Sequence, residues 1–151
     1  TSWEGGFRVP CIFRGPGKIK PGTVDDLAAN LDLYATFATL VGGDQPKDLK
    51  GYISKDFSGV LLRGEAGPRK QWLYSQGRTS AFRSGNYKIH LFSKDRSSNP
   101  DTRRQEPLDK HDPPLLFDLS KDIGEQRNLS SKHPEIVARL LKEMNAFRSS
   151  K

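Results

Sequence analysis

The residues with the clearest potential for chemistry follow an apolar run near the end of the chain, in the stretch PPLLFDLSKDIGEQRNL (113–129). Its acidic and amide side chains are Asp118, Asp122, Glu125 and Asn128. An EF-hand calcium loop that began at the first of these acids would need glycine at its sixth position and glutamate at its twelfth. Those positions hold Ile123 and Leu129. The spacing also gives no sign of buried carboxyl groups with separated pKa values, as acid–base catalysis requires. We therefore predict a structural corner, in which these side chains accept hydrogen bonds from turn backbone.

The histidines and the single cysteine show no pattern typical of a metal site or a nucleophile. His90, His111 and His133 lack the spacing of zinc ligands. Cys11 lies in the apolar run RVPCIF, which predicts a buried strand in which the thiol is a small apolar group. A single cysteine also permits no internal disulfide. The sequence contains no P-loop, no G-x-S-x-G motif and no dinucleotide fingerprint.

The chain is basic, with 25 lysine and arginine residues against 18 acidic residues and a net charge of +7 over 151 residues. This balance favours polyanionic partners, such as nucleic acid, sulfated or phosphorylated glycans, or anionic membranes. No nucleic-acid-binding signature accompanies the charge, and no apolar run reaches the ~18 residues of a membrane span. We therefore expect no specific nucleic-acid partner and no membrane partner. A soluble surface with scattered lysines is the simpler interpretation.

Turn and helix signals divide the N-terminal third of the chain. The run at 8–14 lies between glycine-rich turns and predicts a short buried strand. Asp32 is suited to cap a helix over Leu33–Val41, which the following pair of glycines would end. A second helical turn is expected between Ser54, as its cap, and Gly64.

The middle of the chain changes to the alternating pattern of β-strands. Segments 71–77, 79–85 and 86–92 predict an antiparallel meander with a tight Gly–Asn hairpin, and 115–119 (LLFDL) predicts a last strand. Between them, 94–114 is polar and long enough to predict a functional or mobile loop. The third segment has two faces, with Tyr87, Ile89 and Leu91 on one and Lys88, His90 and Phe92 on the other.

A helix is expected at the end of the chain. Ser131 is its predicted cap, and Pro134 and Glu135 suit its first turn. Its apolar residues recur at helical spacing and form one stripe: Ile136, Val137, Leu140, Leu141, Met144 and Phe147. Together these elements predict an α+β module with an antiparallel meander and a terminal helix.

Four segments carry a resemblance to a known family: WEGGFRVPCIFRGPGKIKPG (3–22), LDLYATFATLVGG (31–43), FRSGNYKIHLF (82–92) and PPLLFDLSKDIGEQRNL (113–129). In this order they resemble the C-terminal part of the sulfatase family, in the branch that contains arylsulfatase A and N-acetylgalactosamine-6-sulfatase. The resemblance implies that 1–45 is the closing strand–helix segment of a large, alkaline-phosphatase-like α/β domain. It implies that 46–151 is a C-terminal subdomain, in which about four antiparallel strands pack on the terminal helix.

The resemblance also implies sulfate ester hydrolysis with a formylglycine and a calcium ion in the full-length family member. The C/S-x-P-S/A-R motif from which formylglycine is made does not occur in this sequence. In the family the calcium ligands and the last sulfate-binding lysine lie upstream of the stretch that begins here at Thr1. We therefore expect no cofactor, no metal site and no catalytic residue in this chain, and no sulfatase activity from the chain alone.

In the family the C-terminal subdomain leans on the large domain and lines part of the substrate cleft. Arg83, Lys88 and His90 are then our candidates for a basic rim that faces an anionic substrate, and the alternative is that they are ordinary exposed strand residues. The alternative function is a freestanding basic module that binds a sulfated glycan or another polyanion. We also expect a homo-oligomer, because RVPCIF and 33–41 would expose apolar surface without a parent sheet. Family members are usually lysosomal, secreted or periplasmic, and the N-x-S sequon at Asn128 matters only in a secreted eukaryotic protein.

Overall fold

The computed structural model describes residues 2–44, 54–75, 79–93 and 108–149. The chain divides into two compact units, one made of Thr1–Val9 with Gln71–Lys151 and the other made of Pro10–Lys70. These units differ from the sequence ranges that we assigned to two domains, 1–45 and 46–151. That assignment refers to the domains of a whole sulfatase and stays a prediction.

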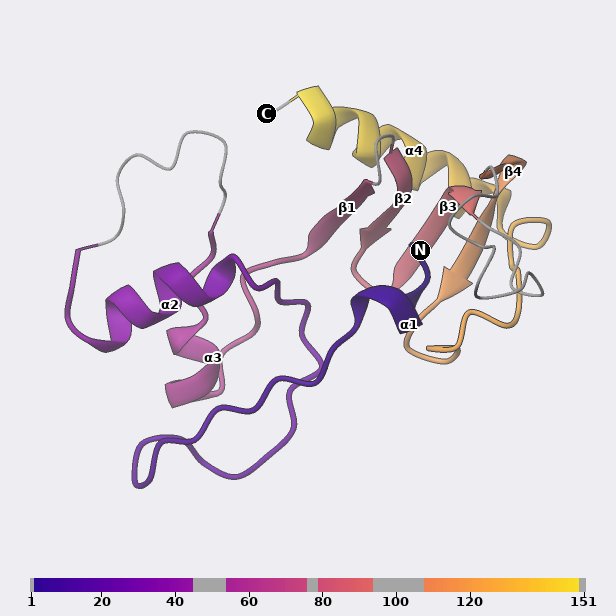
Figure 1. Cartoon of the computed structure of the whole chain (residues 1–151). Helices are drawn as coiled ribbons and strands as arrows, with labels where there is room; N and C mark the ends of the chain where they lie inside the picture. The colour runs from indigo at the N-terminus through magenta and orange to yellow at the C-terminus, as the bar shows by residue number, and fades with distance from the viewer. Residues whose placement is uncertain (1, 45–53, 76–78, 94–107, 150–151) are drawn as a thin grey trace. The chain divides into compact units, whose positions relative to one another are not determined.

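The larger unit contains a four-stranded sheet in which every neighbouring pair is antiparallel. Its strands are β1 (Gln71–Ser75), β2 (Thr79–Ser84), β3 (Tyr87–Ser93) and β4 (Asp109–Asp118), in the spatial order of the sequence (Figure 1). The β2–β3 hairpin is tight because Gly85 takes a φ of 58°, which a residue without a Cβ adopts at little cost. The predicted meander, and with it the α+β class, is confirmed.

The last strand begins earlier than its apolar residues indicate. β4 starts at Asp109, where it pairs with Ser93, although the sequence predicted a loop until Leu115. Its first residues are largely exposed, so no buried face imposes the apolar alternation by which a strand is recognised. The predicted loop was therefore wrong for 109–114, and 94–107 lie outside the described residues.

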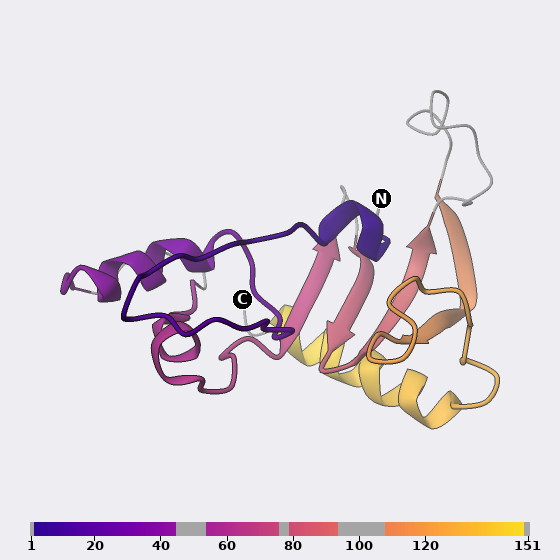
Figure 2. The ribbon, with the colours of Figure 1, turned by 90° about the horizontal axis from the view of Figure 1, so that it is seen from below.

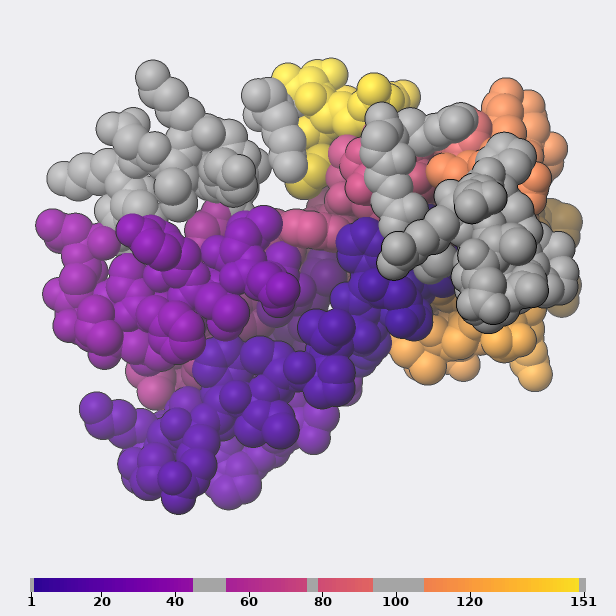
Figure 3. Space-filling view, in the orientation of Figure 1, coloured from indigo at the N-terminus to yellow at the C-terminus, as the bar shows by residue number. Residues whose placement is uncertain are grey.

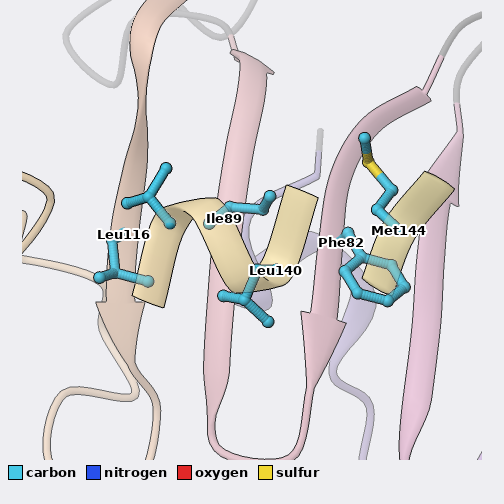
Figure 4. Packing of buried hydrophobic residues seen from close by; sticks show 6 residues of the cluster. Phe82, Ile89, Leu116, Leu140 and Met144 are labelled. Atoms are coloured by element: carbon cyan, nitrogen blue, oxygen red, sulfur yellow. The ribbon is translucent and has the colours of Figure 1, made fainter. Parts of the chain in front are cut away.

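Helix α4 (Pro134–Ser149) covers one face of this sheet. Its apolar stripe packs against Phe82 of β2, Ile89 of β3 and Leu116 of β4 (Figure 4). The fully or nearly buried members of this core are Phe82, Ile89, Leu116, Val137, Leu140 and Met144. Because each such side chain stabilises the fold by roughly 1.5–3 kcal/mol, this face contributes much of the hydrophobic stability of the unit. The predicted terminal helix and its stripe are confirmed.

The N-terminal segment lies on the opposite face of the sheet. It contains α1 (Glu4–Phe7), which Figure 2 shows on the side of the strands away from α4. In the space-filling view these indigo residues lie in front of the strands (Figure 3). The sheet is therefore covered on both faces, by α4 on one and by the short N-terminal segment with α1 on the other.

The smaller unit contains α2 (Asp32–Leu40) and α3 (Ser58–Arg63). Both helices were predicted, and α3 ends as expected at Gly64, which has a φ of 68°. The predicted strand at 8–14 was wrong, because no described residue of 8–31 pairs in a sheet. Cys11 is consequently exposed and not buried. An extended apolar run becomes a strand only where a neighbour satisfies its backbone groups, and this run has no such neighbour in the described structure.

Two predicted helix caps have other roles in this unit. The carboxylate of Asp32 is buried against the guanidinium of Arg69 and accepts hydrogen bonds from the backbone N–H groups of Ala29 and Lys55, both at 2.8 Å. The hydroxyl of Ser54 donates to the carbonyl of residue 31 at 2.7 Å. Both side chains tie separate segments together instead of capping their own helix.

None of the helices that the structure describes combines the length and the apolar character that crossing a bilayer requires.

Candidate functional site

The three candidate residues lie on the sheet face that carries α1. Lys88 and His90 alternate with the core residue Ile89 along β3, and Arg83 lies opposite Lys88 on β2. Lys88 and His90 are both 0% exposed, whereas Arg83 keeps some exposed surface. The N-terminal segment and the corner after β4 cover Lys88 and His90, so the alternative that these two are ordinary exposed strand residues is wrong. Whether any of the three contacts a substrate stays a prediction.

These residues belong to a buried charge cluster, a name used here for six side chains that meet on this face. Its members are Glu4, Tyr74, Arg83, Lys88, His90 and Glu125. They come from α1, from three strands and from the corner between β4 and α4. The sheet thus brings together residues that are up to 121 positions apart in the sequence.

Glu4 is the anchor of the N-terminal segment. One oxygen of its carboxylate, Oε1, lies 2.8 Å from the ammonium of Lys88 and accepts a hydrogen bond from the Tyr74 hydroxyl at 3.1 Å. Its other oxygen lies 4.0 Å from the guanidinium of Arg83. Lys88 also lies over the ring of Tyr74, 4.2 Å from its centroid, which adds a cation–π contact.

Glu125 holds the cluster from the other side. Its Oε1 lies 3.1 Å from the Lys88 ammonium and 2.7 Å from His90 Nε2, and its Oε2 accepts the backbone N–H of Glu4 at 2.7 Å. The residue takes a φ of 53°, which is uncommon for any residue other than glycine. Glu125 therefore joins the corner, β3 and the N-terminal segment through one carboxylate.

The predicted corner is confirmed for the other three polar residues of that stretch. Asp118 accepts hydrogen bonds from the backbone and hydroxyl of Ser120, at 3.1 and 2.6 Å. Asp122 accepts the N–H of residue 127 at 2.7 Å, and Asn128 accepts two backbone N–H groups at 3.0 Å. Glu125 departs from the prediction, since the one backbone group it holds belongs to a segment remote in sequence.

His90 is enclosed by aromatic rings. Trp3 stacks on it with ring centroids 4.2 Å apart, and Phe117 meets it edge-on at 5.7 Å. Because Glu125 is a carboxylate acceptor, Nε2 carries the proton and donates, which leaves Nδ1 to accept from the Ser2 hydroxyl at 3.4 Å. Burial lowers the pKa of His90, and although the contact with Glu125 opposes this shift, the imidazole is held neutral.

The cluster balances its charge. Lys88 and Arg83 supply two positive charges, and Glu4 and Glu125 supply two negative ones. Burial alone would raise the pKa of Glu125, but the hydrogen bond from His90 and the charge of Lys88 bring it below its ordinary value. Burial and the charge of Glu4 raise the pKa of Tyr74, so its hydroxyl stays protonated and donates. In the described part of the chain, no buried side-chain nitrogen or oxygen lacks a hydrogen-bond partner.

The acidic side chains that the structure describes are not arranged to hold a calcium ion. Within the described ranges, no three His, Cys, Asp or Glu side chains are grouped so that they could hold a metal. The acids that looked most like calcium ligands, Asp118 and Asp122, are engaged with backbone and hydroxyl groups. The buried charge cluster neutralises its own buried charges and fixes the N-terminal segment on the sheet.

Sequence reasoning found Lys88 and His90 but missed their partners Glu4 and Glu125. One signal was available, because the face of β3 that carries Lys88 and His90 also carries Phe92. A strand with an apolar residue on each face is often covered on both, and a buried lysine then requires a carboxylate nearby. The signal does not say which of the 18 acidic residues supplies it.

Comparison with known proteins agrees with this architecture. The family model described as the C-terminal region of aryl-sulfatase matches residues 67–150. The chain belongs to the sulfatase family. Bovine arylsulfatase A is 37% identical over 152 residues, which covers 93% of this chain and 30% of the relative. The N-acetylgalactosamine-6-O-sulfatase of Bacteroides thetaiotaomicron is 30% identical over 142 residues, covering 93% of this chain and 27% of the relative. This chain thus spans about 30% of the length of these relatives.

Solved structures share this fold. A Bacteroides thetaiotaomicron structure reported with the metabolism of multiple glycosaminoglycans matches with a TM-score of 0.66 and 25% identity, over 89% of this chain and 28% of that one. A sulfatase from Pseudoalteromonas sp. matches with a TM-score of 0.63 and 22% identity, over 78% of this chain and 25% of that one. The four-stranded sheet with its terminal helix is therefore the C-terminal region of a sulfatase, as the sequence resemblance implied.

Proposed function

We propose that this chain completes a sulfuric ester hydrolase of the arylsulfatase type, in which it forms the C-terminal region and lines part of the substrate cleft. The observation that carries the proposal is the likeness to arylsulfatase A, which extends over 93% of the chain and so includes both compact units. The formylglycine nucleophile and the calcium ligands would lie in the part of the protein that precedes these residues. When bound there, the calcium ion would stabilise the charge that develops on the sulfate.

The buried charge cluster supports a positioning role in such an enzyme. Residues 2–7 would lead from the catalytic part of the protein onto the C-terminal sheet. Glu4 and Glu125 fix that entry point through Lys88, by contacts of 2.8 and 3.1 Å, and through the hydrogen bond from the Glu4 backbone to Glu125 at 2.7 Å. Because catalytic groups must be held within a fraction of an ångström of the productive geometry, a fixed entry point would help to keep the cleft in shape.

Direct contact of the candidate residues with a sulfated substrate remains a prediction. Arg83 is the most accessible of the three, with 11% of its side chain exposed. Lys88 and His90 are fully buried, and both contact Glu125. We therefore propose that Arg83 approaches the anionic substrate and that Lys88 and His90 act through the carboxylates they hold.

The test is a comparison of the intact protein with this chain alone. The intact protein, encoded with its upstream sequence and expressed with a formylglycine-generating enzyme, is expected to hydrolyse an aryl sulfate. The 151-residue chain alone is expected to give no turnover above a blank. Turnover by the isolated chain, or an upstream sequence without the C/S-x-P-S/A-R motif, would overturn the proposal.

The net charge of +7 favours a second candidate, a freestanding module that binds a sulfated glycan or another polyanion. Titration of the chain with heparin and with duplex DNA over a series of salt concentrations separates these cases. Heparin binding that persists at salt concentrations where DNA is released supports the module. Equal and steeply salt-dependent binding to both shows non-specific charge attraction and counts against it.

We also propose that the isolated chain self-associates. The smaller unit exposes apolar side chains on and beside α2, with Tyr34, Phe37 and Val41 at 59%, 51% and 82% exposure. Apolar surface of this kind favours contact with a second copy. Light scattering at high protein concentration is expected to give a mass above the 16.9 kDa of the monomer, and a monomeric mass would contradict the proposal.

A further inference from the structure

Three strands of the sheet surround the carboxylate of Glu4 with donors. We call Tyr74, Arg83 and Lys88 the Glu4 cradle. β1 contributes the Tyr74 hydroxyl at 3.1 Å, β3 contributes the Lys88 ammonium at 2.8 Å, and β2 places the Arg83 guanidinium at 4.0 Å. Glu4 reaches this cradle from a separate segment, and its backbone N–H donates a hydrogen bond to Glu125 in the corner.

The cradle needs an anion to be stable. With Glu4 in place, two cations face two carboxylates. Without the Glu4 carboxylate, Lys88 would keep its contact with Glu125, but the largely buried guanidinium of Arg83 would lose the carboxylate that faces it, and one positive charge would be left over. A buried charge without a partner is strongly destabilising, so the vacated cradle would attract any anion that fits it.

We propose that the Glu4 cradle is a binding site for a small monocarboxylate, of which the Glu4 side chain is the resident occupant. The proposal does not depend on the enzymatic function proposed above, because it concerns contacts within the larger unit. Size supports a carboxylate over other anions. Replacing glutamate by alanine removes Cγ, Cδ and both carboxylate oxygens, and these are the non-hydrogen atoms of acetate. The Tyr74 hydroxyl and the Lys88 ammonium would donate to acetate as they donate to Glu4.

The experiment is chemical rescue of the full chain carrying Glu4→Ala. Thermal unfolding is followed by circular dichroism in sodium acetate and in sodium chloride at equal ionic strength, so that screening is the same in both. Acetate is expected to raise the folding equilibrium constant of Glu4→Ala by about ten-fold when its concentration is ten times its Kd. Wild-type protein, whose cradle is filled, is expected to show no difference between the two salts.

A matched control is Glu65→Ala. This variant also loses a carboxylate that pairs with an arginine, Arg63, but the two side chains are 55–59% exposed, so that no enclosed site is left behind. Acetate is expected to leave this variant unchanged, and formate and sulfate are compared with acetate on both variants. Sulfate stabilises folded proteins in general, so only its effect beyond that on Glu65→Ala counts. A larger specific effect of sulfate than of acetate would show that the site does not select a carboxylate.

Two further outcomes decide the proposal. If Glu4→Ala does not fold in chloride, recovery of its circular dichroism in acetate supports the cradle, and failure to recover contradicts it. Adding Lys88→Met to Glu4→Ala removes the main cation and is expected to abolish the acetate effect. An acetate effect of the same size in this double variant would place the binding elsewhere and overturn the proposal.

Discussion

The two faces of the sheet in the larger unit are covered in opposite ways. On one face, α4 packs apolar side chains against Phe82, Ile89 and Leu116. On the other face, the N-terminal segment contacts Lys88 through the Glu4 carboxylate and His90 through the stacked ring of Trp3, and the corner contacts both through Glu125. The same strand, β3, contributes to both, since its residues alternate between the faces.

The two kinds of covering contribute differently, one to the stability of the unit and the other to the position of the N-terminal segment. Apolar packing is non-directional and roughly proportional to the buried area, so the α4 face tolerates small shifts of the helix. Ion pairs and hydrogen bonds between buried groups hold only in one geometry, and each group depends on the others. The α4 face therefore provides stability to the unit, and the charged face determines where the N-terminal segment lies.

The largest effect is expected from removing the shared cation. Lys88→Met keeps much of the side-chain volume but leaves the carboxylates of Glu4 and Glu125 buried without their ammonium. Removing one member of a buried ion pair typically costs ~3–5 kcal/mol, and we expect a loss of that size in the free energy of unfolding. Urea denaturation of the variant and of the wild type measures it.

Combining Lys88→Met with Glu4→Gln tests whether this loss comes from unbalanced charge. The double variant is expected to lose clearly less stability than the sum of the two single variants, because each change removes the partner of the other. Strictly additive losses would mean that the two residues act independently. The buried charge cluster would then not be a unit.

The apolar face is expected to give a smaller loss of a different kind. Leu140 is 0% exposed and belongs to the core beneath the strands. Leu140→Ala removes buried surface and leaves a cavity, which costs about 3 kcal/mol in typical cores. This loss is expected to be the same in the presence and absence of Glu4→Gln, whereas that of Lys88→Met is reduced by Glu4→Gln. An equal reduction for both variants would erase the proposed distinction between the faces.

The apolar face was predictable from the sequence, because its signals are local. The stripe of α4 and the alternation in β3 fall within single elements, so residues a few positions apart report on each other. The cap expected from Asp32 shows the limit of such signals. Its carboxylate was expected to bind nearby backbone, but it also pairs with Arg69, which is 37 positions away.

The charged face was not predictable, because its contacts join distant segments. Glu4 meets Lys88 across 84 positions, and nothing near either residue indicates the other. Glu125 looked like its neighbours Asp118 and Asp122, and only the packing of the corner against β3 separates their roles. The failed strand at 8–14 has the same cause, since pairing depends on a neighbour that the local sequence does not specify.

The smallest expected effect is on the way in which stability depends on pH, and it also distinguishes the two faces. The pKa of His90 is lowered from 6.5 by burial, and the pKa of Glu125 lies below its ordinary 4.5 because His90 and Lys88 outweigh the effect of burial. Both values are lower in the folded chain, so the unfolded chain binds more protons as the pH falls. The contribution of His90 to stability is complete above pH 6.5 and is lost as the pH falls toward its folded pKa. The contribution of Glu125 is lost only below pH 4.5.

His90→Gln keeps a donor toward Glu125 but does not titrate, so its urea midpoint is expected to fall less than that of the wild type between about pH 7 and about pH 5. Leu140→Ala, which alters only the apolar face, should keep the wild-type slope. A His90→Gln slope equal to that of the wild type would show that the charged face does not carry the acid sensitivity.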